Sequence, residues 1–272
     1  MRRLTIEVDG LPVSYLTAGD TGPLLLLLHG TYWSQVWEPV LADLAGAGLR
    51  PVAVDLPGFG RSGGEPTPAE ATVPALAQWA VRFVRALGEA DKPVLLGGHD
   101  IGGGIAQQMF VDGALDIPRL ALMNAVMYDS WPAPTVLHFR DPAVAAATAP
   151  ADILAARRQS VIAALARPAS EAEILAWLDP WTDPRIARSW LSMAVAADHR
   201  YTMALVPALQ ASPKPKLLIW GEEDGFQKVE FAERFAAEIP NSRLVRIAKA
   251  GHIPTANDAA AVAREMIAFF KA

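Results

Sequence analysis

The sequence contains no cysteine. A disulfide framework, thiol catalysis and cysteine-ligated metal sites are therefore excluded. A long apolar run is also missing, since Leu24 to Leu28 is far shorter than the roughly 20 residues that a membrane-spanning helix needs. The start of the chain, Met1-Arg2-Arg3 followed by the alternating segment Leu4 to Val8, has no signal-peptide pattern. We therefore expect a cytoplasmic protein with no membrane partner.

An excess of charge of one sign is missing too. The 24 basic and 29 acidic residues give a formal net charge of −5, and no basic cluster interrupts this balance. Nucleic-acid partners are therefore not expected. Apolar residues are plentiful at 52% of 272 residues. This is enough to bury the core of one α/β domain with an insertion.

Short apolar runs alternate with helical stretches along the chain. Their continuous apolarity is typical of strands in a mostly parallel sheet that is covered on both faces. Strands are expected at Leu4 to Val8, Val13 to Ala18, Leu24 to Leu28, Val52 to Asp55, Val94 to Gly97, Leu120 to Met123, Leu217 to Trp220 and Leu244 to Ile247. Helices are expected at Glu38 to Ala47, Ala69 to Leu87, Ile101 to Val111, Val229 to Glu238 and Asp258 to Phe270. This order indicates a doubly wound α/β domain.

The alternation stops between about Met127 and Gln210, where prolines punctuate Ala-rich helical pieces and no strand is evident. A structureless connection of that length is rare in a compact domain. We therefore expect a helical cap at residues 127–210, inserted between core segments 1–126 and 211–272. The cap should lie over the carboxyl ends of the strands, where open α/β sheets bind ligands.

The segment Gly98-His99-Asp100-Ile101-Gly102 places an aspartate at the centre of a pattern that usually holds a serine. In G-x-nucleophile-x-G, small flanking residues let a sharp turn between a strand and a helix lift the central side chain into a pocket. The apolar run before it and the helical stretch after it fit this context. An alternative is a phosphate-binding loop with Asp100 as a helix N-cap, but neither glycine-rich phosphate pattern can be laid over these residues.

Four other stretches of the sequence, together with this turn, resemble the motifs of one protein family. They are Leu28-His29-Gly30-Thr31, Asp55-Leu56-Pro57-Gly58-Phe59-Gly60-Arg61-Ser62, Trp220-Gly221-Glu222-Glu223-Asp224 and Gly251-His252. From roughly residue 4 to 272, outside the cap, the chain resembles the α/β-hydrolase fold family, which has the chain order nucleophile, acid, histidine. The G-H-D-x-G-G turn is similar to that of the aspartate-nucleophile branch, which contains epoxide hydrolases and haloalkane or haloacetate dehalogenases. The resemblance implies an α/β-hydrolase fold with a mostly parallel eight-stranded sheet, helices on both faces and an inserted helical cap.

The resemblance also implies catalytic roles. Asp100 is the expected nucleophile, His252 the general base and Asp224 the acid that orients this base. Of the five histidines, only His252 follows a late strand after a glycine. The backbone N–H groups of Thr31 and Ile101 are expected to hold the developing oxyanion. The family chemistry implies no cofactor and no metal ion.

Other polar candidates fit these roles less well. Asn124 follows the sixth strand, where some family members keep the acid, but it is not a carboxylate. Two glutamates neighbour Asp224, whose place in W-G-x-x-D matches the family position. His29 and His99 are expected to be packed parts of the fold.

An aspartate nucleophile restricts the substrate. Its attack on an ester carbonyl would give a mixed anhydride, a high-energy acyl donor, so ester cleavage is not expected. Its attack on a saturated carbon with a leaving group gives an ordinary alkyl ester. Water activated by His252 can then hydrolyse that ester at the aspartyl carbonyl. Epoxides and alkyl halides both fit this chemistry.

The residues around the turn favour an epoxide. Ile101 occupies the position of the halide-binding Trp of haloalkane dehalogenases, and Thr31 occupies another position where a halide donor is expected. The arginines that a haloacetate enzyme would have beside the turn are replaced by Gly102 to Gly104. The H-G-x-P pattern of epoxide hydrolases is also incomplete, because His29-Gly30-Thr31-Tyr32 lacks the proline. The epoxide assignment is therefore the better of two imperfect matches.

Opening an epoxide requires a proton donor, because the leaving alkoxide is strongly basic. Asp198-His199-Arg200-Tyr201 is similar to the tyrosine-bearing helix that precedes the seventh strand in the family. Tyr201 is the expected donor, His199 is the alternative, and His138 or Tyr128 could supply a second donor from the cap.

The resemblance therefore implies a cofactor-independent epoxide hydrolase that acts with water on a small apolar organic substrate, as a monomer or a homodimer. One alternative is a haloalkane dehalogenase that uses the same Asp100 ester. Another is a ligand-binding protein that keeps the fold without turnover.

Overall fold

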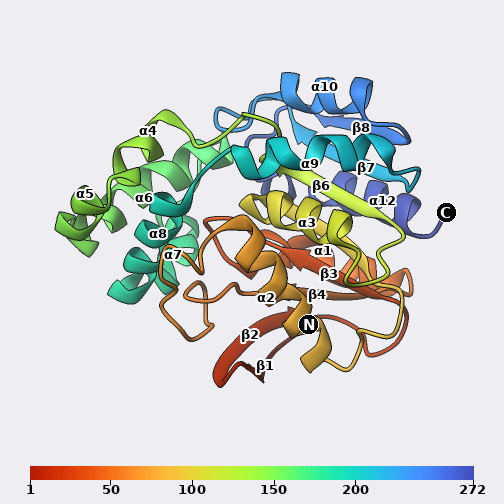
Figure 1. Ribbon diagram of the computed structural model, residues 1–272, viewed down its shortest axis with the longest axis horizontal. Helices are drawn as coiled ribbons and strands as arrows, with labels where there is room; N and C mark the ends of the chain where they lie inside the picture. Colours follow the sequence, from red (N-terminus) through yellow and green to blue (C-terminus); the bar gives the residue numbers. More distant parts are fainter.

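One eight-stranded sheet forms the centre of the molecule (Figure 1). The computed structural model describes residues 1–272. The strands are β1 (Arg2–Val8), β2 (Leu11–Thr17), β3 (Leu24–Leu28), β4 (Arg50–Val54), β5 (Leu95–Asp100), β6 (Leu120–Ala125), β7 (Lys216–Gly221) and β8 (Ser242–Ile247). Their order is β1-β2-β4-β3-β5-β6-β7-β8. Strands β3 to β8 are parallel, and β1 and β2 join antiparallel at one edge, which confirms the expected fold.

Helices cover both faces of this sheet. The core helices are α1 (Glu38–Gly46), α2 (Val73–Ala86), α3 (Ile101–Asp112), α10 (Val229–Glu238) and α12 (Ala259–Phe270), with the short segments η1 (Ser34–Val36) and α11 (Pro254–Asn257). Leu24, Leu26 and Leu28 of β3 pack in one apolar core with α2, α3 and α10. Leu25 and Leu27 pack in the other core with α1 and α12. The continuous leucine run therefore supplies both faces, because successive strand side chains alternate.

The long proline-punctuated insertion is helical, as expected. It contains α4 (Pro134–Leu137), η2 (His138–Arg140), α5 (Pro142–Ala147), α6 (Pro150–Leu165), α7 (Glu171–Leu178), η3 (Asp179–Thr182), α8 (Pro184–Ala196) and α9 (Arg200–Ala211). Helices α4, α5, α6 and α8 each begin at a proline, which suits the first helical turn because proline lacks an N–H and has a fixed φ.

The cap ends earlier than the sequence predicts. Helices α4 to α8 gather at one end of the sheet, whereas α9 lies along α3 of the core (Figure 1). The predicted boundary at residue 210 therefore assigns α9 to the wrong layer, because a helical, strand-free pattern does not show which surface a helix covers. None of the helices has the length and apolarity required to cross a membrane.

Candidate active site

The predicted nucleophile, Asp100, lies in a sharp turn between β5 and α3. Asp100 ends β5 with φ 54° and ψ −126°, and α3 begins at the next residue. This conformation is costly for a side chain other than glycine and persists only where the surroundings enforce it. A Cβ at Gly98 would lie 2.4 Å from the Gly102 carbonyl oxygen, and one at Gly30 would lie 2.2 Å from Asp100 Oδ2. The small residues around the turn therefore allow the close approach that the motif requires.

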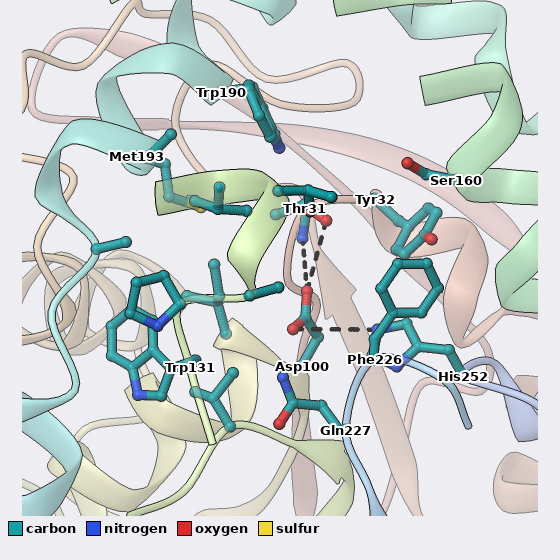
Figure 2. Close-up of a pocket in the computed structure, with 18 of the residues that line it drawn as sticks. Thr31, Tyr32, Asp100, Trp131, Ser160, Trp190, Met193, Phe226, Gln227 and His252 are labelled. Carbon is teal, nitrogen blue, oxygen red and sulfur yellow. Dashed lines mark hydrogen bonds and ion pairs between the residues drawn. The ribbon is translucent and has the colours of Figure 1, made fainter. Parts of the chain in front are cut away.

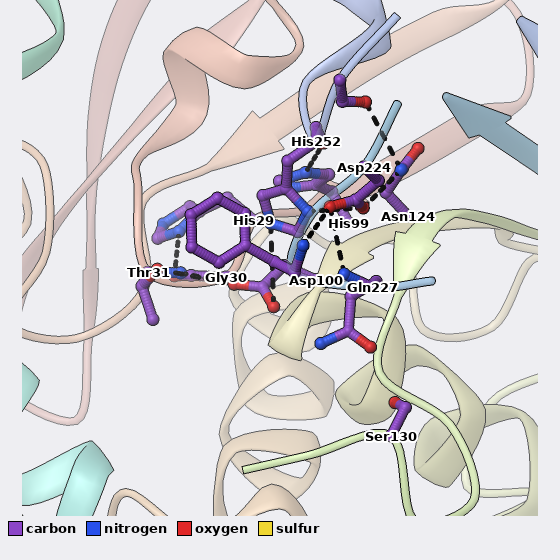
Figure 3. Close-up of polar contacts among 12 residues, drawn as sticks. His29, Gly30, Thr31, His99, Asp100, Asn124, Ser130, Asp224, Gln227 and His252 are labelled. Atoms are coloured by element: carbon purple, nitrogen blue, oxygen red, sulfur yellow. Dashed lines mark hydrogen bonds and ion pairs between the residues drawn. The ribbon is translucent and has the colours of Figure 1, made fainter. Parts of the chain in front are cut away.

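The three predicted catalytic side chains come together at the carboxyl ends of their strands (Figure 3). His252 Nδ1 lies 2.9 Å from Asp224 Oδ2, and His252 Nε2 lies 4.0 Å from Asp100 Oδ1. A carboxylate at Nδ1 accepts the proton of that nitrogen and leaves Nε2 of the neutral ring as an acceptor. His252 therefore presents its basic nitrogen to the space beside Asp100.

Asp224 is fixed by a network that the sequence only partly indicates. Its Oδ1 accepts hydrogen bonds from the backbone N–H groups of Phe226 at 2.7 Å and Gln227 at 3.0 Å. The Asn124 amide donates to Asp224 Oδ2 at 2.6 Å. Burial raises the Asp224 pKa, but the His252 charge and these hydrogen bonds outweigh it, so the pKa is lowered. Asp224 thus stays ionised beside His252, and Asn124 orients it.

Opposing effects set the protonation of the other two groups. Burial lowers the pKa of His252, but the nearby carboxylates of Asp224 and Asp100 outweigh it and raise the pKa above the usual 6.5. Burial raises the pKa of Asp100, and this effect exceeds the lowering by His252 and by backbone hydrogen bonds. The Asp100 carboxylate is therefore poorly solvated.

Two backbone N–H groups face the nucleophile. Thr31 N–H donates to Asp100 Oδ2 at 3.3 Å, and Ile101 N–H also interacts with this carboxylate. The Thr31 hydroxyl lies 3.5 Å from the same oxygen. The two N–H groups that the sequence analysis expected at an oxyanion site therefore both lie beside the Asp100 carboxylate.

His29 and His99 are packed parts of the fold, as expected. Leu56 N–H donates to His29 Nε2 at 2.9 Å, and His29 Nδ1 donates to the Gly30 carbonyl at 2.8 Å. His99 Nε2 donates to the His252 carbonyl at 2.8 Å. Burial holds the pKa of His99 well below its usual value, so this ring stays neutral beside His252. Both side chains therefore support the loops that contain Gly30 and His252.

Asp100 opens into a cavity of about 100 Å³ between core and cap (Figure 2). Most of its wall is apolar: Trp131 and Pro132 line it from the loop after β6, and Trp190 and Met193 line it from α8. The indole N–H of Trp131 is already used, since it donates to Thr202 Oγ1 at 2.7 Å. Such a cavity suits a small organic substrate.

The proton donors predicted from the sequence lie elsewhere. Tyr201 does not line the cavity; it packs behind the wall, against the apolar cluster that contains Trp131. His199 and His138 are exposed, and Tyr128 is buried against Phe235. The structure therefore corrects these assignments, because the motif near Tyr201 locates a helix but not the direction in which its side chains point.

Tyr32 and Arg157 are polar residues of the cavity wall that the sequence analysis does not assign to the site. Tyr32 follows the oxyanion residue in the chain, and its ring centroid lies 6.1 Å from that of His252. Arg157 enters the cavity from α6 and is only 6% exposed. A signal for Arg157 exists in the sequence: it stands four residues after Ile153 and four before Val161, both buried, so it belongs to the buried stripe of its helix.

Comparison with known proteins finds partial matches to several curated enzymes. Epoxide hydrolase 3 from Xenopus tropicalis is 33% identical over 138 residues, which are 50% of this chain and 35% of that protein. A haloalkane dehalogenase from Mycobacterium marinum is 28% identical over 123 residues, 44% of this chain and 41% of that protein. The acetyltransferase component of the acetoin cleaving system from Cupriavidus necator is 35% identical over 121 residues, 44% of this chain and 31% of that protein. The chain thus spans about a third of the length of the curated relatives it matches first.

Solved structures share the whole architecture. Haloalkane dehalogenase DbeA from Bradyrhizobium elkani has a TM-score of 0.83 at 23% identity, covering 98% of this chain and 96% of that one. The epoxide hydrolase CorEH has a TM-score of 0.81 at 22% identity, covering 99% and 98%. Identities this low establish the fold. The model of the alpha/beta hydrolase family matches residues 25–265, and the chain belongs to that family.

Proposed function

We propose that this hydrolase opens small epoxides to vicinal diols through a covalent ester on Asp100. The observation that carries the proposal is a buried carboxylate at the nucleophile turn, 4.0 Å from His252 Nε2 and beside the Thr31 N–H. A carboxylate gains from attack on a saturated carbon, because the product is a stable ester with a hydrolysable carbonyl. The apolar side chain of Ile101 at the cavity wall favours an epoxide over a halide.

In the first step, an Asp100 oxygen attacks a ring carbon and the carbon–oxygen bond of the epoxide breaks. The electron pair moves to the ring oxygen, which needs a proton. We propose Tyr32 as the donor, since it is the tyrosine that lines the cavity, beside His252 and Phe226 (Figure 2). Burial, as the largest effect, raises its pKa to about 12. The phenol therefore stays protonated at neutral pH, yet it is more acidic than the alcohol that forms.

In the second step, His252 takes one proton from a water molecule and the hydroxide adds to the aspartyl carbonyl carbon. Thr31 and Ile101 N–H groups hold the oxyanion. When the tetrahedral intermediate collapses, its bond to the substrate oxygen breaks, and that oxygen takes the proton from His252 to complete the diol. The second proton of the water returns Tyr32 to its phenol form. The 4.0 Å separation between His252 Nε2 and Asp100 Oδ1 leaves room for the water to approach.

The test compares the wild type with Tyr32→Phe and Tyr201→Phe on matched sets of small epoxides and haloalkanes. We expect diol formation without halide release from the wild type. In Tyr32→Phe, the rate of ester formation from epoxides should fall about 100-fold, a common contribution of a general acid. Tyr201→Phe is the matched control and should react like the wild type.

Three results would contradict this account. Halide release without diol would make the protein a dehalogenase, and Trp190, whose indole nitrogen lies at the end of the ring facing Thr31 and Asp100, would be the halide donor to examine (Figure 2). A loss in Tyr201→Phe alone would restore the sequence-based donor. The absence of any ester or product from both sets would indicate a binding protein.

A further inference from the structure

Arg157 is a buried cation that forms no ion pair, although it lies near enough to Asp100 to act to lower the pKa of that carboxyl group. Its neighbour Arg158 pairs with Glu171 at the surface. The Arg157 guanidinium has no carboxylate partner; its Nη2 donates to the Thr31 carbonyl at 3.3 Å, and its Nε has no hydrogen-bond partner. A charge taken out of water is costly unless it is paired and hydrogen-bonded. The folded protein alone therefore leaves this group incompletely satisfied.

The surroundings hold the guanidinium rigidly instead of neutralising it. Its central carbon lies 4.7 Å from the Tyr32 ring centroid and 4.9 Å from that of Trp181. Two aromatic rings restrict its plane while leaving N–H donors free at its edge. Ser160, one turn further along α6, also lines the cavity (Figure 2), so this face of the helix is directed at the site.

Thr31 connects this cation to the nucleophile. Its N–H donates to Asp100 Oδ2, and its carbonyl accepts from Arg157. Asp100 and Arg157 therefore contact the two ends of the same residue, and a ligand that touches both of their side chains can be short. The cavity of about 100 Å³ also restricts the ligand to a few heavy atoms. A planar guanidinium with free N–H groups matches a carboxylate, which accepts two hydrogen bonds from it.

We propose that Arg157 binds the carboxylate of a small anionic substrate whose reactive carbon lies next to that carboxylate. This inference rests on the proposed function and deepens it: the substrate is an oxirane carboxylate rather than a wholly apolar epoxide. The haloacetate-type arginines beside the turn are absent, and a cap residue supplies the cation instead. Asp100 opens the ring as described above, and the product is a dihydroxy acid.

The first test compares oxirane-2-carboxylate with oxirane-2-carboxamide, a neutral analogue of the same size. We expect wild-type kcat/KM to favour the acid by about 100-fold, as expected of a buried polar group that pairs with only one of two substrates. Arg157→Met should lower this preference about 100-fold, mainly by raising KM for the acid. Arg158→Met is the matched control and should keep the wild-type preference, and Arg157→Lys should keep part of it.

The second test measures binding without chemistry. By calorimetry, propanoate should bind the Asp100→Asn variant and should fail to bind Asp100→Asn/Arg157→Met. Circular dichroism and thermal melts establish that each variant is folded, and Arg157→Gln replaces Arg157→Met if the latter is not.

The outcomes separate this inference from the proposed function. If propanoate does not bind, or if Arg157→Met lowers kcat/KM equally for acid and amide, Arg157 serves the fold or the leaving group and the inference is overturned. Ester formation on Asp100 from the amide but not from the acid overturns it as well, while the proposed function stands. Propanoate binding without an ester from either epoxide retains the anion site and rejects the proposed function.

Discussion

Asp100→Asn is expected to lower epoxide turnover at least about 10⁴-fold, because it removes the nucleophile while keeping the shape of the side chain. The amide oxygen of the introduced asparagine can still accept a hydrogen bond from the Thr31 N–H, so the turn should keep its geometry. No ester should form on residue 100. Product formation in single-turnover experiments measures this effect, and Asp152→Asn, an exposed change on the cap, is the control.

A thermal melt distinguishes this loss from unfolding. The folded protein raises the pKa of Asp100, so at neutral pH the charged form is less favourable in the folded state than in the unfolded state. Removing the charge should therefore leave the melting temperature equal to or above that of the wild type. An inactive Asp100→Asn protein with a lower melting temperature would instead indicate a structural role for Asp100.

His252→Gln is expected to stop the reaction halfway. Asp100 should still attack the substrate, because the nucleophile and the proton donor remain. Hydrolysis of the ester should slow by about 10³- to 10⁴-fold without the base. Intact mass should then show about one adduct per chain, located on the peptide that contains Asp100. His138→Gln, at an exposed cap position, is the control and should show no adduct.

The wild type should also accumulate the Asp100 ester at acidic pH. His252 can take a proton from water only when it is neutral, and its pKa is raised above 6.5 by Asp224 and Asp100 despite burial. The ester should therefore accumulate as the pH falls through that pKa. Intact mass after an acid quench measures the ester at each pH, and the ester should rise over the range in which NMR titration of the free enzyme shows His252 gaining its proton. An ester level that does not change with pH would contradict the role of His252 as the base.

The sequence predicts the scaffold well, and it predicts correctly that Asp100, Asp224 and His252 lie close together. The apolar run Leu24 to Leu28 coincides with β3, and Val229 to Glu238 coincides with α10. Asp100, Asp224 and His252 could be placed because each stands at or after the carboxyl end of a predicted strand, and the carboxyl ends of parallel strands meet at one edge. Short-range pattern and parallel topology are sufficient for this part of the site.

Residues that act from the cap or from loop packing could not be placed in the same way. Tyr201 matches a family pattern, but its side chain packs behind Trp131, and pattern alone does not fix the rotation of a helix. Tyr32 occupies the position of a family proline, so in the sequence it is visible only as a departure from the family pattern. Arg157 is recognisable as a charge within an apolar stripe, but its role depends on the Thr31 carbonyl and two aromatic rings from distant parts of the chain.

The most direct test of the covalent mechanism is a single turnover in water enriched in oxygen-18, with enzyme in excess over epoxide. The account predicts that the new oxygen in the diol comes from Asp100 and is unlabelled, while the peptide containing Asp100 gains one heavy oxygen. A labelled diol with an unlabelled Asp100 peptide would show that water attacks the epoxide directly, and it would contradict the role of Asp100 as nucleophile.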